Sequence, residues 1–181
     1  MERTWIIVLL ALTMATGCKD DKSGDSEKSE ASQEAVAAKA EAEDMLEKMY
    51  LSAAHYYEAP RVASGTGARL PCQFPASTEG WHPAGKACDT DSKRFPAAPD
   101  QWSSPTWYSL NFEITAEHYG QYKVESSGVF GDATATFMAR VDPDCDGTYT
   151  VYTRTISGEA NASNAGCTAT KDDGEVQEKT E

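Results

Sequence analysis

The sequence has few basic residues. Its 16 Lys and Arg side chains are outnumbered by 29 Asp and Glu side chains, so the formal net charge is −13. A surface of this charge repels the phosphates of nucleic acids and the headgroups of anionic lipids. We therefore expect no nucleic-acid partner.

The chain also lacks the short motifs of common catalytic sites. It has no Gly-x-Ser-x-Gly elbow, no His-Glu-x-x-His pair, no phosphate-binding glycine loop and no Cys-x-x-Cys. Its three histidines, His55, His82 and His118, stand in unlike contexts, and we expect structural or surface roles for them. The sequence favours a non-enzymatic protein. A small envelope enzyme that gathers His82, His118 and a carboxylate in one pocket is the less favoured alternative.

The apolar run Trp5–Leu12 is too short to span a bilayer, because a transmembrane helix needs about 20 apolar residues. It follows a short charged segment, Met1–Thr4, and precedes the small residues Ala15, Thr16 and Gly17. This order is typical of a secretory signal peptide.

Cys18 comes directly after these residues, and the segment MATGC that it ends resembles the lipobox of bacterial lipoproteins. In that family the thiol is diacylated, the peptide is cut before the cysteine, and the new amine is usually acylated. The family prefers Leu where this chain has Ala15. The resemblance implies a lipoprotein signal peptide over residues 1–17 and a membrane anchor of palmitate-type chains on Cys18. The alternative is an ordinary signal peptide cleaved near Ala15.

This resemblance also bears on location. Lys19 stands where the usual inner-membrane retention signal has Asp. We therefore expect a lipid-anchored protein of the cell envelope, at the outer membrane, with its folded part on the periplasmic or outer side.

Composition divides the rest of the chain. Residues 18–33 are almost entirely polar and predict a disordered tether. Residues 34–59 are rich in helix formers and repeat apolar residues at three- and four-residue steps, which predicts a long amphipathic helix ending before Pro60. Residues 171–181 return to the tether composition and predict a disordered acidic tail.

The C-terminal half changes to a period of two. Segments rich in aromatic and β-branched residues alternate apolar with polar positions and are separated by turns; they are 107–114, 119–127, 133–141 and 149–157. They predict a four-stranded antiparallel meander with the helix on one face. The fold class is α+β, in one domain over residues 34–170, with a long irregular loop between helix and strands.

Four distal cysteines, Cys72, Cys88, Cys145 and Cys167, fit an exported domain held by disulfides. Four cysteines allow three pairings, which sequence does not decide. Nearest-neighbour pairing is the simplest: a Cys72–Cys88 bridge would staple the long loop, and a Cys145–Cys167 bridge would tie the tail to the sheet edge.

An acidic turn follows the third predicted strand. Asp142, Asp144 and Asp146 occupy alternate positions before Gly147, as at the start of a calcium-binding hand. That hand needs a Glu at the twelfth position, where this chain has Thr153, and it lies between helices, so we reject it. Two interpretations stay open: a bare Asp-Gly turn with Gly147 at positive φ, or a shallow site in which two or three carboxylates hold calcium.

The order of these segments resembles the globular part of type IV pilins and pilin-like proteins of delta-proteobacterial type. The matching features over roughly residues 35–158 are an Ala- and Tyr-rich helix end, the stretch with Trp107, Leu110 and Phe112, Tyr119 with Tyr122, and the turn Asp142–Thr148. The resemblance implies a helix packed on a four-stranded antiparallel sheet. In the related pseudopilins, aspartates of a C-terminal loop bind calcium, which adds modest support to the calcium interpretation of the acidic turn, because the surrounding residues differ.

The N-terminus departs from that family, because a lipobox stands in place of the pilin leader and its apolar helix. The expected function is therefore a lipid-anchored, non-enzymatic, pilin-like envelope protein that acts as an interaction or adhesion module or as an accessory of a pilus or secretion system. Its expected partners are the membrane, through the anchor, and proteins of such systems. The alternative is a genuine minor subunit of a type IV pilus.

Overall fold

The structure, a computed structural model, describes residues 23–159, 161–163, 166–170 and 176–181. The predicted signal peptide and Cys18 lie outside the described residues. The helices are α1 (Ser23–Glu58) and α2 (Pro105–Ser109), and the strands are β1 (Gln121–Ser127), β2 (Thr134–Val141), β3 (Thr150–Gly158), β4 (Ala169–Thr170) and β5 (Gln177–Thr180). The described residues also form three short 3-10 turns: η1 (Ala87–Asp89), η2 (Pro99–Trp102) and η3 (Phe130–Asp132). The α+β class is confirmed.

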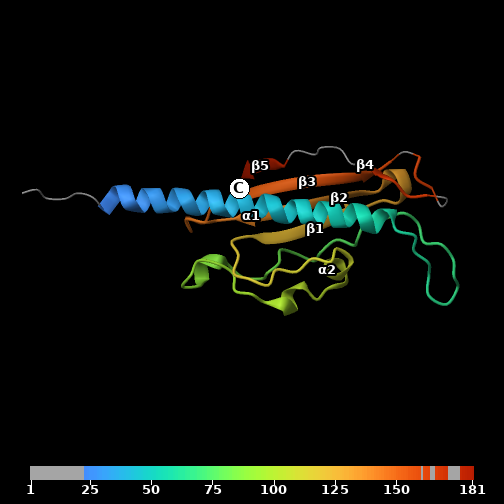
Figure 1. The fold of residues 1–181 in the computed structure, drawn as a ribbon, viewed down its shortest axis with the longest axis horizontal. Coiled ribbons are helices and arrows are strands. Elements are labelled where there is room, and N and C mark those ends of the chain that lie inside the picture. The colour runs from blue at the N-terminus through green and yellow to red at the C-terminus, as the bar shows by residue number, and fades with distance from the viewer. Residues whose placement is uncertain (1–22, 160, 164–165, 171–175) are drawn as a thin grey trace, which may run out of the picture.

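Helix α1 lies along one face of the sheet and continues past it toward Ser23 (Figure 1). Its buried positions recur every three or four residues, which puts them on one stripe: Ala38, Ala42, Leu46, Met49, Ala53 and Tyr57. The predicted amphipathic helix is confirmed. Among the described residues, no helix is both long enough and apolar enough to cross a membrane.

The start of α1 was predicted wrongly, because the helix begins at Ser23 instead of residue 34. The later part of the expected tether is therefore helical. Glu27, Lys28 and Glu30 in this segment are good helix formers, although its serines and Gly24 are weaker ones. Once the packed part of a helix has formed, each further residue adds a hydrogen bond without a new nucleation cost.

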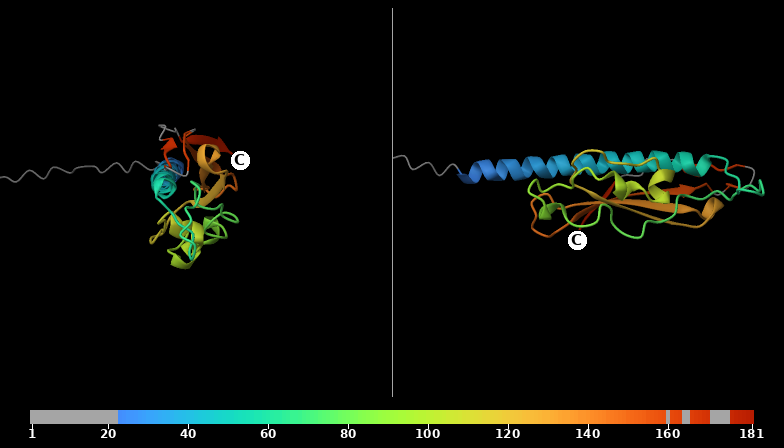
Figure 2. Two further views of the ribbon diagram at one scale, coloured as in Figure 1. Left: turned by 90° about the vertical axis from the view of Figure 1, so that its right-hand side faces the viewer. Right: turned by 90° about the horizontal axis from the view of Figure 1, so that it is seen from below.

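The sheet has five strands, and every pair in it is antiparallel. Strands β1, β2 and β3 form the predicted meander, with Val124 opposite Phe137 and Ala139 opposite Tyr152. Strands β4 and β5 both pair with β3. Figure 2 shows α1 on one side of this sheet and the irregular segment before β1 below it.

The segment 107–114 is not a strand, so that prediction was wrong. It begins inside helix α2 and continues as irregular chain. Pro105 occupies the first turn of α2, where its missing N–H costs nothing. Asn111 then takes a positive φ of 46°, which ends the helix. Alternate residues are still buried, so the apolar pattern that indicated a strand reports burial and not β-structure.

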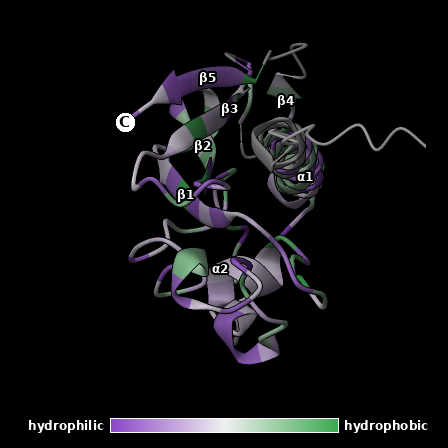
Figure 3. Cartoon of the chain, turned by 90° about the vertical axis from the view of Figure 1, so that its left-hand side faces the viewer, coloured by the Kyte–Doolittle hydropathy of each residue, from purple (hydrophilic) through white to green (hydrophobic). Residues whose placement is uncertain are grey.

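The expected disordered tail was also wrong in its described part. Gln177–Thr180 pairs with Thr150–Thr153 of β3, and Lys39 of α1 donates to Glu178 at 2.7 Å. All four side chains of β5 are exposed, and the strand has the colour of hydrophilic residues in Figure 3. Backbone hydrogen bonds and polar side-chain contacts place this edge strand, so no hydrophobic pattern could have predicted it.

The two disulfides join Cys72 to Cys167 and Cys88 to Cys145, with Cα–Cα distances of 5.5 and 5.6 Å. The predicted cysteines are confirmed as bridged, but the nearest-neighbour pairing was wrong. Both bridges connect the long loop to the C-terminal half. Pairing requires Cα atoms within about 7 Å, which is set by the fold and not by sequence distance.

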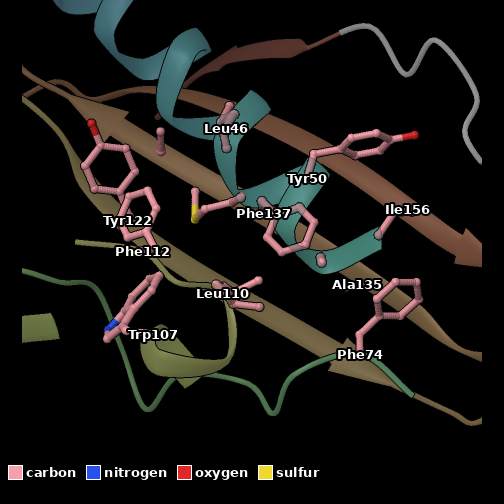
Figure 4. Close-up of a cluster of buried hydrophobic side chains, with 14 of the residues drawn as sticks. Leu46, Tyr50, Phe74, Trp107, Leu110, Phe112, Tyr122, Ala135, Phe137 and Ile156 are labelled. Carbon is pink, nitrogen blue, oxygen red and sulfur yellow. The ribbon is translucent and has the colours of Figure 1, made fainter. Parts of the chain in front are cut away.

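The core lies between α1, the sheet and the segment around α2 (Figure 4). Leu46 and Tyr50 of α1 approach Phe137 and Ile156 of the sheet, while Trp107, Leu110 and Phe112 close the lower side. Trp102 packs edge-on against Trp107 and Phe112, with ring centroids 5.2 and 5.3 Å apart. Interlocking aromatic rings thus replace the predicted first strand.

Candidate functional site

The acidic turn joins β2 to β3, as predicted. One carboxylate oxygen from each of Asp142, Asp144 and Asp146 lies within 4.8 Å of the other two. The structure therefore brings together the three side chains that sequence singled out. Gly147 adopts a φ of 88°, as predicted for the turn, and Cys145 also lies in the left-handed region at 60°.

Backbone amides hold the carboxylates in place. The N–H of Gly147 donates to Oδ2 of Asp142 at 3.1 Å, and the N–H of Thr148 donates to Oδ1 of Asp146 at 2.6 Å. The Cys88–Cys145 bridge ties the turn to η1. Strands β2 and β3, the hydrogen bonds to its own backbone and the Cys88–Cys145 disulfide therefore hold the turn in place.

The surroundings of Asp142 disfavour its ionised form. Its Oδ1 is shut off from solvent and has no hydrogen-bond partner among the described residues. Burial raises the pKa of Asp142 above its usual value, and the neighbouring carboxyls of Asp144 and Asp146 raise it further, against the lowering effect of the Gly147 amide. An uncompensated buried carboxylate oxygen beside two more carboxylates is the environment that a cation relieves.

The donors fit a hard cation. All three are carboxylate oxygens, the ligands that calcium prefers, and calcium takes about 6–8 oxygens. Three protein oxygens leave the remaining positions to water, so the arrangement fits a shallow site. Asp144 and Asp146 are exposed, which leaves an open path to solvent.

The turn has neighbours that sequence reasoning missed. A hollow of about 240 Å³ beside it is lined by Ala31 and Ala35 of α1 together with Asp144, Asp146 and Thr148. These alanines belong to the part of α1 near its start. The segment 23–33 is rich in Ser and contains Gly24, so its composition gave no clear signal that would have found them.

The histidines lie apart from this turn. His55 is exposed near the end of α1. His82 packs edge-on against Trp107, with ring centroids 5.6 Å apart, and His118 stacks on Phe95 at the same distance. His118 is 1% exposed, and burial lowers its pKa below the usual value, whereas its hydrogen bond with Ala116 and the Glu41 charge oppose that shift. The rings of His82 and His118 act as aromatic packing partners.

Comparison of the chain with models of protein families, with curated proteins and with solved structures gives no match.

Proposed function

We propose that the chain is a lipid-anchored, non-enzymatic protein of the cell envelope, in which α1 carries a pilin-like domain away from the membrane. The domain would act as an interaction or adhesion module, or as an accessory of a pilus or secretion system. The resemblance of residues 14–18 to a lipobox supports the anchor. The order of helix, irregular loop and antiparallel sheet supports the pilin-like domain.

The observation that carries the proposal is the reach of α1. The helix is packed from Ala38 onward, and it extends past the sheet toward Ser23 (Figure 1). Residues 31–37 are exposed apart from the half-buried Glu34. A helix rises 1.5 Å per residue, so an exposed helical segment between an acylated Cys18 and the sheet would hold the domain off the bilayer as a stiff spacer.

This observation also separates the proposal from a genuine pilus subunit. A pilin forms the fibre core with an apolar first half of its helix, whereas the sequence at the start of α1 is SGDSEKSE. Charged side chains in a fibre core would have to lose their hydration without partners, which is costly. The minor-pilin alternative therefore has less support.

The acidic turn adds a second element to the proposal, a calcium site formed by Asp142, Asp144 and Asp146. The buried, unpartnered Oδ1 of Asp142 supports it. Calcium supplies positive charge there and locks the link between β2 and β3. In this role the ion is structural. The stability of this end of the domain would then depend on the calcium concentration outside the cytoplasm.

The anchor is tested by mass spectrometry of the mature N-terminus, with the wild type compared with Cys18→Ser. We expect an acylated Cys18 in membrane fractions and a soluble, unacylated variant. A mature N-terminus at another residue contradicts the anchor and, if methylated, supports the pilin alternative.

The accessory role has a separate test. Pull-down of pilus or secretion components by the wild type but not by Cys18→Ser would support this role. Unchanged motility and secretion in a deletion strain would contradict it.

A further inference from the structure

A hollow of about 570 Å³ lies between α1 and the segment 99–115. Its floor consists of Trp102, Trp107 and Phe112, which are 2%, 0% and 2% exposed. The three rings contact one another, with centroids 5.2 to 5.3 Å apart. None of these residues takes part in the acidic turn or in either disulfide.

The rim is polar and carries charges of both signs. Exposed side chains of Lys48, Asp100, Ser103, Asn111, Glu113 and Thr115 surround the opening. Tyr108 also lines it, and 73% of this residue is exposed. This exposed ring, beside hydroxyl, amide and carboxylate groups, offers a ligand both an apolar face and hydrogen-bonding groups.

The floor has unmet hydrogen-bonding capacity. The indole Nε1 atoms of Trp102 and Trp107 are both shut off from solvent, and neither has a hydrogen-bond partner among the described residues. An indole N–H can only donate, and buried donors without partners are uncommon in folded proteins. Neither N–H is reached from the hollow in this structure, so the hydrogen bonds to a bound ligand must come from the rim.

The charges narrow the class of ligand. Nζ of Lys48 lies 5.4 Å from the centroid of Phe112, so a protein amine already holds the cation position over that ring. The Lys48 charge would repel an organic cation, and the carboxylates of Asp100 and Glu113 would repel an anion. A purely apolar ligand would bury the rim without satisfying it. A neutral ligand rich in hydroxyl groups is repelled by neither sign of charge, and it can form hydrogen bonds with the polar groups of the rim.

We propose that this hollow binds a neutral oligosaccharide. The C–H faces of a sugar ring are apolar and pack on aromatic rings such as Tyr108. Its hydroxyls both donate and accept, as the mixed rim requires. The volume lies in the range of about 300–1,000 Å³ that small-molecule sites occupy. The proposal deepens and rests on the interaction role proposed above, and it names glycans as the partner chemistry.

The test is retention of the purified full-length chain on a panel of immobilised neutral, sialylated and sulfated glycans, followed by titration of the retained neutral glycan with tryptophan fluorescence as readout. We expect binding to neutral glycans and a fluorescence change from Trp102 and Trp107. Tyr108→Ala should weaken binding about tenfold through loss of the aromatic platform. Val62→Ala, which removes a 64% exposed side chain outside the hollow, is the matched control and should bind as wild type.

Glu113→Gln is a second test of the proposal, and it does not depend on whether Tyr108→Ala folds. It keeps the size of the side chain and changes its hydrogen bonding, so it should also weaken binding. No retention on any neutral glycan, preference for the sialylated or sulfated glycans, or equal binding by all three variants would overturn the proposal. Running the assay on both acylated chain and Cys18→Ser keeps its failure distinct from failure of the anchor.

Discussion

The carboxylate of Glu41 on α1 accepts a hydrogen bond of 3.0 Å from the hydroxyl of Tyr122 on β1. The same carboxylate accepts from the backbone N–H groups of Tyr119 at 2.9 Å and Gly120 at 3.1 Å. Burial first, and then the Glu41 charge, hold the pKa of Tyr122 well above its usual value, so its hydroxyl remains a donor. One acidic side chain of the helix thus pins the start of β1.

Glu41→Ala should lower the free energy of unfolding by about 2–3 kcal/mol, because it leaves the Tyr122 hydroxyl and two backbone donors unpaired. Urea denaturation measures this. Asp44→Ala, an exposed acid on the same helix, is the control and should change stability little. Tyr122→Phe should cost about 1 kcal/mol, and a double-mutant cycle of Glu41→Ala with Tyr122→Phe should give a positive coupling energy. Additive effects of the two substitutions would contradict the pairing.

The long helix, the meander of β1 to β3 and the acidic turn could be predicted because each depends on local pattern. Ala38 to Tyr57 repeat at helical spacing, and Asp142 to Gly147 are neighbours in sequence. The rest depends on contacts distant in the chain. The bridge partner of Cys72 lies 95 residues away, and β5 has no apolar residue to mark it. The hollow combines Lys48 of α1 with residues 99–115, and no sequence spacing relates them.

Peptide mapping without reduction should find Cys72 linked to Cys167 and Cys88 linked to Cys145. Replacing both cysteines of the first pair with Ser should destabilise the domain more than replacing both of the second. The first bridge spans 95 residues and the second 57, and the loop-entropy relation makes the difference about 0.5 kcal/mol. Denaturant unfolding of the two double variants measures it. A peptide joining Cys72 to Cys88 would contradict the structure directly.

His118 should make stability fall in mild acid. Burial lowers its folded-state pKa, so below the unfolded value of about 6.5 the unfolded chain takes up a proton before the folded chain does. Above that pH both states are neutral and this group contributes no pH dependence. Stability should therefore fall as pH drops below about 6.5, by at most about 1.4 kcal/mol per pH unit, until the folded state also protonates.

Unfolding free energies at several pH values measure this effect. His118→Phe keeps an aromatic ring beside Phe95 and cannot protonate, so it should remove the mild-acid loss. His55→Phe, at an exposed position, should retain it. An unchanged pH profile in His118→Phe would show that other groups are responsible.

Calcium should stabilise the chain through the acidic turn. The raised folded-state pKa of Asp142 means that its ionisation opposes folding as pH rises above about 3.9, the unfolded value. Calcium would offset this repulsion and bind the folded state, adding about 2.7 kcal/mol at a concentration 100 times the dissociation constant. Thermal unfolding with calcium or with chelator measures the shift. Asp146→Asn should reduce it, whereas Asp132→Asn, outside the turn, should not; a calcium shift equal in both variants would place the ion elsewhere.

Gly158 lies where β3 passes η3 and the end of α1. The hydroxyl of Tyr57 donates to the carbonyl of Phe130 at 2.6 Å, and a Cβ on Gly158 would collide with both of these oxygens. The Phe130 oxygen belongs to the backbone and cannot rotate away. Gly158→Ala should therefore displace η3 or break this hydrogen bond, at a cost of about 1–3 kcal/mol. Gly166→Ala, whose added Cβ meets no atom of the described residues within 4 Å, is the matched control and should leave the urea midpoint almost unchanged. Equal midpoints for the two variants would mean that β3 and η3 can separate freely, which the tight Tyr57–Phe130 contact argues against.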